Sequence, residues 1–129
     1  MAEGWTNHLG KNWIEARSAG IEVHEVSSRA VAAMREVGID IAHQKSKLLN
    51  PEIVSWADLI VTVCGYVDRV CPALPAGVRK RHWPLFDPSR LEGGEEDVML
   101  IHRALRDHIG SLVRGLVKDV TTGEAPVQT

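Results

Sequence analysis

The stretch Asp58-Leu-Ile-Val-Thr-Val63 is the part of this sequence that most restricts its fold. A short and nearly continuous apolar run is typical of a strand buried on both faces of a parallel sheet. Cys64 follows the run directly, and the carboxyl end of such a strand is where open α/β sheets bind their ligands. The second cysteine, Cys71, comes after six more residues and is followed by Pro72. The sequence therefore predicts a buried strand that presents one of two neighbouring thiols.

The rest of the chain alternates predicted strands with predicted helices. Strands are predicted at 13–17, 58–63 and 80–85. Helices are predicted at 2–9, from Ser27 or Ser28 to Val37, at 51–56 and at 95–118. This order favours an α/β fold with a parallel sheet and crossover helices, although three strands are few for a sheet covered on both faces.

The helix predicted at 95–118 has the clearest pattern. Its apolar residues form a single stripe, which consists of Val98, Ile101, Leu105, Ile109, Leu112 and Leu116. The mostly polar residues that follow, 120–129, are expected to form a flexible tail. We expect one domain over residues 1–119, because a chain of 129 residues can build a single hydrophobic core.

Charge and composition argue against several classes of function. The net charge of -2 gives no reason to expect a nucleic acid or an anionic membrane as partner. No apolar run approaches the roughly 20 residues that span a bilayer, and the first residues lack the pattern of a secretory signal. We therefore expect a cytoplasmic protein, and in that setting a pair of cysteines is more often catalytic than structural.

Five segments occur in an order and at spacings that match a known family. They are Met1-Ala-Glu-Gly-Trp5, Ser18-Ala-Gly-Ile-Glu22, Asp58-Leu-Ile-Val-Thr-Val-Cys64, Cys71-Pro-Ala-Leu-Pro75, and His82-Trp83 with Phe86-Asp87-Pro88. Together they resemble the thioredoxin-coupled arsenate reductases, which share the fold of the low-molecular-weight tyrosine phosphatases. The resemblance covers about residues 1–117 and implies a three-layer α/β/α domain. It is specific, because the phosphatases proper lack the redox pair that Cys64 and Cys71 match.

The same family has a strand and a Cys-x5-Arg loop before the Met-Ala-Glu-Gly-Trp segment. That loop carries the nucleophilic cysteine and the arginine that holds the oxyanion. These 129 residues contain neither the motif nor a third cysteine. We therefore expect a sheet without its first, central strand, between the strands at 13–17 and 58–63, and a chain that does not reduce arsenate by itself. A truncated fragment, an incorrect start site and a paralogue without the loop are all compatible with the sequence.

The resemblance implies a relay of three thiols. The loop cysteine bonds to arsenic, Cys64 attacks that sulfur and releases arsenite, and Cys71 resolves the mixed disulfide. Thioredoxin or a similar thiol system then reduces the Cys64–Cys71 disulfide, and no bound cofactor is implied. Asp87, in its Asp-Pro turn, matches the general acid of the family. We expect a complete enzyme of this kind to be a monomer.

Two residues match positions that hold a structural potassium ion in some members of the family. They are Glu3 and Ser18, and the third match should be an aspartate, but Lys47 stands there. The lysine ammonium can supply the positive charge that the ion supplies elsewhere, so we expect no bound metal. The other interpretation is that Lys47 is simply solvated.

Other interpretations of the same residues stay open at this point. A cysteine can be a buried and inert thiol, and an aspartate before a proline can simply form a turn. A tyrosine phosphatase-like enzyme would need the same loop, whereas a non-catalytic redox or binding module would only offer the cysteine pair to a partner. The basic run Arg79-Lys80-Arg81 is expected to be a solvated face, and the other interpretation is that it attracts an oxyanion or an acidic partner surface. The four tryptophans are expected to serve packing.

Overall fold

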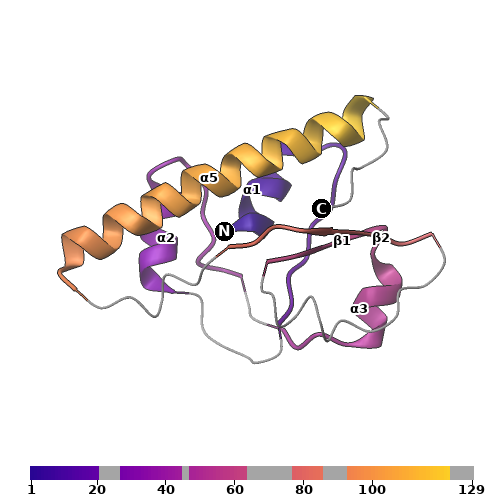
Figure 1. The fold of residues 1–129 in the computed structure, drawn as a ribbon, viewed down its shortest axis with the longest axis horizontal. Helices are drawn as coiled ribbons and strands as arrows, with labels where there is room; N and C mark the ends of the chain where they lie inside the picture. Colours follow the sequence, from indigo (N-terminus) through magenta and orange to yellow (C-terminus); the bar gives the residue numbers. More distant parts are fainter. Residues whose placement is uncertain (21–26, 45–46, 64–76, 86–92, 123–129) are drawn as a thin grey trace.

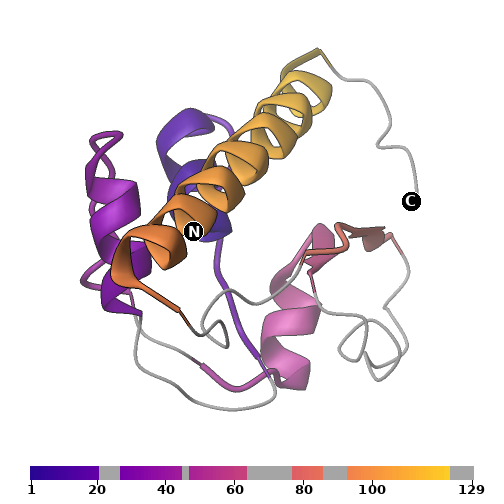
Figure 2. The same ribbon diagram turned by 60° about the vertical axis from the view of Figure 1, so that its left-hand side comes forward.

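The computed structural model of the protein describes residues 1–20, 27–44, 47–63, 77–85 and 93–122. Along the chain the elements are α1 (Ala2–Leu9), α2 (Ser28–Arg35), α3 (Pro51–Trp56), β1 (Leu59–Thr62), β2 (Arg79–His82) and α5 (Glu95–Thr122). Figures 1 and 2 show α1 and α5 on one side of the two strands and α3 on the other. The described part of the chain therefore has the layered α/β arrangement that the sequence predicts.

The two strands confirm the predicted parallel pairing. Leu59 lies opposite Arg79, and Thr62 lies opposite His82. Both strands are a little shorter than the predicted ranges, although backbone hydrogen bonds from Trp83 N and Leu85 N continue the pairing beyond β2. The described sheet has the order β1-β2, and the predicted vacancy for a central strand stays a prediction.

The strand predicted at 13–17 is wrong. The backbone turns there, because Trp13 N and Ile14 N both donate hydrogen bonds to the carbonyl of Gly10, each at 2.8 Å. The backbone N of Ala16 then donates to Oδ1 of Asn7, also at 2.8 Å. This segment therefore satisfies its hydrogen bonds against α1 and not in a sheet. The described β-bridge nearest to it is a parallel one further on, from Gly20 to Leu48.

Capping residues explain where the short helices begin and end. The hydroxyl of Ser27 accepts a hydrogen bond from Ala30 N at the start of α2. After α2 the chain turns at Gly38, whose φ of 82° is in the left-handed region that favours glycine. At the start of α3, Asn50 Oδ1 accepts from Ile53 N at 2.9 Å, and Pro51 occupies the first turn, where no helical donor is needed.

The long helix α5 covers the core. Residues from α1, α2 and the strand side pack against its buried face, and the cluster includes Trp5, Met34, Ile41, Trp83, Leu105, Ile109, Val113 and Leu116. The stripe predicted for this helix is largely confirmed, but Val113 is fully buried whereas Leu112 is only partly buried. The indole Nε1 of Trp5 also donates a hydrogen bond to the carbonyl of Arg106 at 3.0 Å, which ties α1 to α5.

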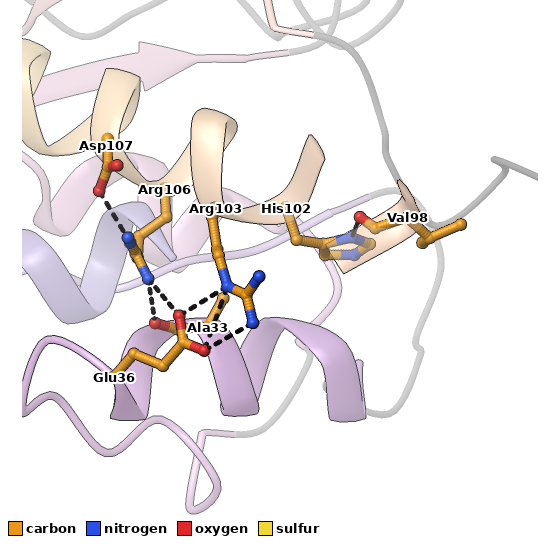
Figure 3. Close-up of polar contacts among 7 residues, drawn as sticks. All are labelled: Ala33, Glu36, Val98, His102, Arg103, Arg106 and Asp107. Carbon is orange, nitrogen blue, oxygen red and sulfur yellow. Dashed lines mark hydrogen bonds and ion pairs between the residues drawn. The ribbon is translucent and has the colours of Figure 1, made fainter. Parts of the chain in front are cut away.

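Ion pairs fasten α2 to α5 at the solvent boundary (Figure 3). Arg103 donates from Nε and Nη2 to the carboxylate of Glu36, each at 2.9 Å. Arg106 donates from Nη1 to Glu36 at 2.8 Å and to the carbonyl of Ala33 at 2.9 Å. These bonds, first those from Arg103, lower the pKa of Glu36. The carboxylate is therefore a shared acceptor that links the two helices.

The tryptophans fall into two groups. Trp5 and Trp83 are buried in the core, as predicted. Trp13 and Trp56 are 66% and 41% exposed, so these two do not belong to the core. The guanidinium of Arg17 lies over the face of Trp56, 4.1 Å from the ring centroid, in a cation–π contact.

None of the described helices combines the length and the apolar character needed to cross a membrane.

Candidate functional site

The carboxyl ends of β1 and β2 form the edge at which the sequence predicts a site. Because the strands are parallel, the segments that follow β1 and β2 leave the sheet at the same edge. Cys64 comes two residues after the end of β1, and Asp87 comes five residues after the end of β2. Cys64, Cys71 and Asp87 themselves lie outside the described residues. The structure thus describes the two segments that lead to the predicted site residues.

Backbone hydrogen bonds continue beyond the end of β2 and hold these two segments together. Trp83 N donates to the carbonyl of Thr62 at 2.8 Å, and Leu85 N donates to the carbonyl of Val63 at 3.3 Å. Val63 is the residue directly before Cys64. The segment after β1 is therefore hydrogen-bonded to the segment after β2 up to Val63, the residue before Cys64.

A side-chain contact at the same edge was not anticipated from the sequence. Oγ1 of Thr62 lies 2.7 Å from Nδ1 of His82, and one of these two atoms donates a hydrogen bond to the other. Thr62 is only 3% exposed. The signal in the sequence is a single hydroxyl within an otherwise apolar strand, but its partner becomes evident only once the register of the two strands is known.

The structure brings together the three residues that match the potassium positions. Oε1 of Glu3 accepts hydrogen bonds from the backbone N and the hydroxyl of Ser18, and it lies 4.0 Å from Nζ of Lys47. Backbone bonds join the segments: Gly20 N donates to the carbonyl of Lys47, and Leu49 N donates to the carbonyl of Gly20. One carboxylate oxygen thus already has two donors and a nearby ammonium, and this set of groups does not suit an added cation. That Lys47 takes the place of the ion stays a prediction.

Histidines in the described residues do not gather with other ligands. Where the structure describes the chain, no group of three or more His, Cys, Asp and Glu side chains is placed to hold a metal ion. His102 is 1% exposed, and its Nδ1 lies 2.8 Å from the carbonyl of Val98 one turn earlier (Figure 3). A carbonyl only accepts, so Nδ1 is the donor, and the imidazole is held as a core residue of α5.

The basic run at β2 differs from the solvated face that the sequence predicts. Arg79 is exposed and Lys80 is half-buried. Arg81, by contrast, is buried, with a side chain that is 8% exposed, and its Nη2 pairs with Asp119 of α5. The prediction is wrong for Arg81 because side chains alternate between the faces of a strand, and this one points toward the long helix.

Sequence comparisons place the whole described region in one family. A profile of the family described as "Low molecular weight phosphotyrosine protein phosphatase" matches residues 1–125. An arsenate reductase of Halalkalibacterium halodurans is 44% identical over 115 residues, which cover 88% of this chain and 82% of that protein. An arsenate reductase of Bacillus licheniformis is 43% identical over 125 residues, which cover 96% of this chain and 87% of that protein.

Solved structures with a similar fold include enzymes of two activities. An arsenate reductase from Archaeoglobus fulgidus superposes with a TM-score of 0.66 at 29% identity, over 91% of this chain and 87% of that one. An arginine phosphatase from Geobacillus stearothermophilus superposes with a TM-score of 0.73 at 25% identity, over 95% of this chain and 84% of that one. The fold is therefore shared between reductases and phosphatases, and the residues at the site must separate the two.

Proposed function

This chain belongs to the low molecular weight phosphotyrosine protein phosphatase family, and within it we propose the function of an arsenate reductase that works through a cysteine relay. The relatives that are 43 and 44% identical over most of the chain are arsenate reductases. The observation that carries the proposal is the position of Cys64. Cys64 follows the carboxyl end of β1 in a chain that is this similar to arsenate reductases, and Cys71 comes seven positions later in the sequence.

In the proposed reaction, arsenate is the oxidant and two thiols supply the electrons. A first thiolate displaces water from protonated arsenate and forms an As–S bond. The Cys64 thiolate attacks that sulfur, the S–As bond breaks, and its electron pair stays on arsenic, which leaves as arsenite. Cys71 then attacks the sulfur of Cys64, expels the first thiol and leaves the Cys64–Cys71 disulfide. Each step is an attack by a thiolate, and the last is a thiol–disulfide exchange; their rates depend on thiolate fraction and access.

The first thiol is not among these residues, since Cys64 and Cys71 are the only two cysteines of the 129. In our proposal the first thiol sits in a Cys-x5-Arg loop, as in the family that the sequence resembles. Asp87 is the general acid that protonates the departing oxygen of arsenate. Lys47 provides the positive charge behind that loop, supported by its 4.0 Å approach to Glu3.

The reductant and the setting follow from the same chemistry. A disulfide is returned to two thiols by a dithiol protein of the thioredoxin type, which takes the oxidised pair by exchange. We propose such a reductant, a cytoplasmic setting where dithiol proteins are kept reduced, and no bound cofactor.

The test compares two forms of the protein in an assay of NADPH oxidation coupled through thioredoxin reductase and thioredoxin. The 129-residue chain alone is expected to show no arsenate-dependent oxidation. The same chain extended before Met1 by a strand and a Cys-x5-Arg loop is expected to show it, and Cys64→Ser or Cys71→Ser in the extended form should abolish turnover. Turnover by the 129 residues alone would contradict the need for the loop, and an inactive extended form that binds arsenate would contradict the reductase.

A phosphatase is the second candidate, favoured by the likeness to the solved arginine phosphatase. Phosphoester or phosphoarginine hydrolysis uses the same loop but has no need of Cys64 or Cys71. Hydrolysis of p-nitrophenyl phosphate by the extended form, at a rate unchanged in Cys64→Ser, would favour this candidate. Loss of arsenate turnover in that variant favours the reductase.

A further inference from the structure

Three contacts converge on the last two described residues before Cys64. The carbonyl of Thr62 accepts from Trp83 N at 2.8 Å, and the carbonyl of Val63 accepts from Leu85 N at 3.3 Å. The third is the side-chain bond between Thr62 and His82 at 2.7 Å. The backbone bonds form with any residue type at these positions, whereas the third bond depends on the hydroxyl and the imidazole.

The bond between Thr62 and His82 matters because Thr62 is buried. At 3% exposure its hydroxyl has little access to solvent, and the short bond to His82 satisfies it within the strand pair. The hydroxyl also lies 3.5 Å from the carbonyl of Arg81, at the limit of hydrogen-bonding distance. A buried hydroxyl is costly to leave without a hydrogen-bond partner, so this bond favours one arrangement of the strand ends over others.

We infer that Thr62 and His82 are positioning residues for the thiol of Cys64. Their bond joins the carboxyl end of β1 to β2, two residues before Cys64 in the sequence. This inference rests on the proposed function, because it gives Cys64 the central role in the relay. Both residues lie in segments that match the family, but neither the sequence nor the match indicates this role for them.

The step that such positioning affects is the closure of the Cys64–Cys71 disulfide. The two thiols lose two protons and two electrons, an S–S bond forms, and an added oxidant such as diamide takes up both protons and both electrons. Closure needs the two Cα atoms within about 7 Å. A shift of the strand end before Cys64 would change how the two sulfurs approach, and a misplacement of about 1 Å can cost on the order of 100-fold in rate.

The experiment measures closure in the full 129-residue chain, and therefore does not depend on arsenate. The reduced protein is mixed with diamide, quenched with acid at intervals, alkylated and analysed by mass spectrometry. Thr62→Val keeps the shape but removes the hydroxyl, and it should close about 10-fold more slowly. The equilibrium constant for forming the Cys64–Cys71 disulfide should fall by the same factor. This change raises the reduction potential of the cysteine pair by about 30 mV, which is measured in dithiothreitol buffers.

Conservative and control variants separate positioning from general damage. Thr62→Ser restores the hydroxyl and should close within twofold of the wild-type rate. His82→Gln tests the bond from its other side and should close as slowly as Thr62→Val, so the test stands even where Thr62→Val does not fold. Ile60→Val removes one methyl from the same face of β1 and should keep the wild-type rate and potential.

The outcomes are distinguishable. Wild-type rate and potential in both Thr62→Val and His82→Gln would overturn the inference and leave the relay intact. Slow closure in Thr62→Ser and Ile60→Val as well would also overturn it, because the effect would then be one of packing. A wild-type chain that forms no Cys64–Cys71 disulfide would overturn the proposed relay, and this inference with it.

Discussion

Glu3 and Ser18 are joined by two hydrogen bonds to a single carboxylate oxygen. Oε1 of Glu3 accepts from the backbone N of Ser18 at 2.7 Å and from its hydroxyl at 3.0 Å. The ammonium of Lys47 lies 4.0 Å from the same oxygen. The pair ties α1 to the segment that follows it, and the prediction that Lys47 takes the place of a potassium ion can be tested at this oxygen.

Lys47→Asp should turn this place into a potassium site. The substitution replaces an ammonium with a carboxylate, so that two carboxylates and a hydroxyl supply oxygen ligands for a cation. With potassium at 10 times its Kd, the folded state gains about 1.4 kcal/mol. Urea unfolding measures this gain as the difference in the free energy of unfolding between potassium chloride and choline chloride at the same concentration.

The wild-type protein and Lys47→Met are the controls for that experiment. Neither adds a carboxylate, so neither should gain stability in potassium over choline. A wild-type protein with the same potassium gain as Lys47→Asp would show that Lys47 does not stand in for the ion.

Glu36→Gln should reduce the acid sensitivity of the fold. Bonds from Arg103 and Arg106 lower the pKa of Glu36 in the folded state. The carboxylate therefore stabilises the fold above its unfolded pKa of about 4.3, and that contribution is lost as the pH falls through the lowered folded pKa. The stability difference between wild type and variant should be largest near neutral pH and shrink on acidification.

Urea unfolding at a series of pH values from about 6 to about 3 measures this difference. Glu52→Gln, on the exposed surface of α3, is the matched control. A wild-type advantage over Glu36→Gln that stays constant across the whole series would show that the ionised carboxylate does not link the helices.

Two glycines of α5 should respond in opposite directions to alanine. A Cβ on Gly110 would lie 2.9 Å from Cζ2 and 3.0 Å from Cε2 of the buried Trp5 ring, whereas a Cβ on Gly115 would meet nothing within 4 Å. Alanine in a helix gains about 1 kcal/mol over glycine, but overpacking costs about 1–3 kcal/mol. Thermal unfolding should show Gly115→Ala more stable than wild type and Gly110→Ala less stable.

Equal stabilisation by the two substitutions would mean that the Trp5 ring can move away at no cost. The hydrogen bond from Trp5 Nε1 to the carbonyl of Arg106 argues against such movement, because it fixes the ring one turn from Gly110.

Local patterns were sufficient to predict most helices and the parallel strands. Helix starts and helix faces depend on residues that are close in the sequence. Examples are Asn50 and Pro51 at α3, the serine before α2 and the apolar stripe of α5. The segment 13–17 gave a wrong prediction because its alternation is that of a strand, while its actual hydrogen bonds go to Gly10 and to the side chain of Asn7. An alternating pattern shows which side chains are apolar, but it does not show which groups the backbone N–H and C=O hydrogen-bond to.

Contacts between distant residues could not be predicted in this way. Arg106 and Glu36 are 70 positions apart, and Thr62 and His82 are 20 positions apart. Arg81 looks like part of a surface run until the fold places Asp119 beside it. At the candidate site, the resemblance gave Cys64, Cys71 and Asp87 as predictions, whereas the bond between Thr62 and His82 needed the register of β1 and β2.

The central claim is that Cys64 and Cys71 form the disulfide that a dithiol protein reduces. The most direct measurement is NADPH consumption when the oxidised 129-residue chain is added to thioredoxin and thioredoxin reductase, with thiols counted by alkylation before and after. Because a disulfide takes two electrons, we predict one NADPH per chain, two new thiols assigned to Cys64 and Cys71, and no consumption by Cys64→Ser or Cys71→Ser. An oxidised chain whose two cysteines stay unlinked, or whose disulfide thioredoxin leaves intact, would contradict this claim.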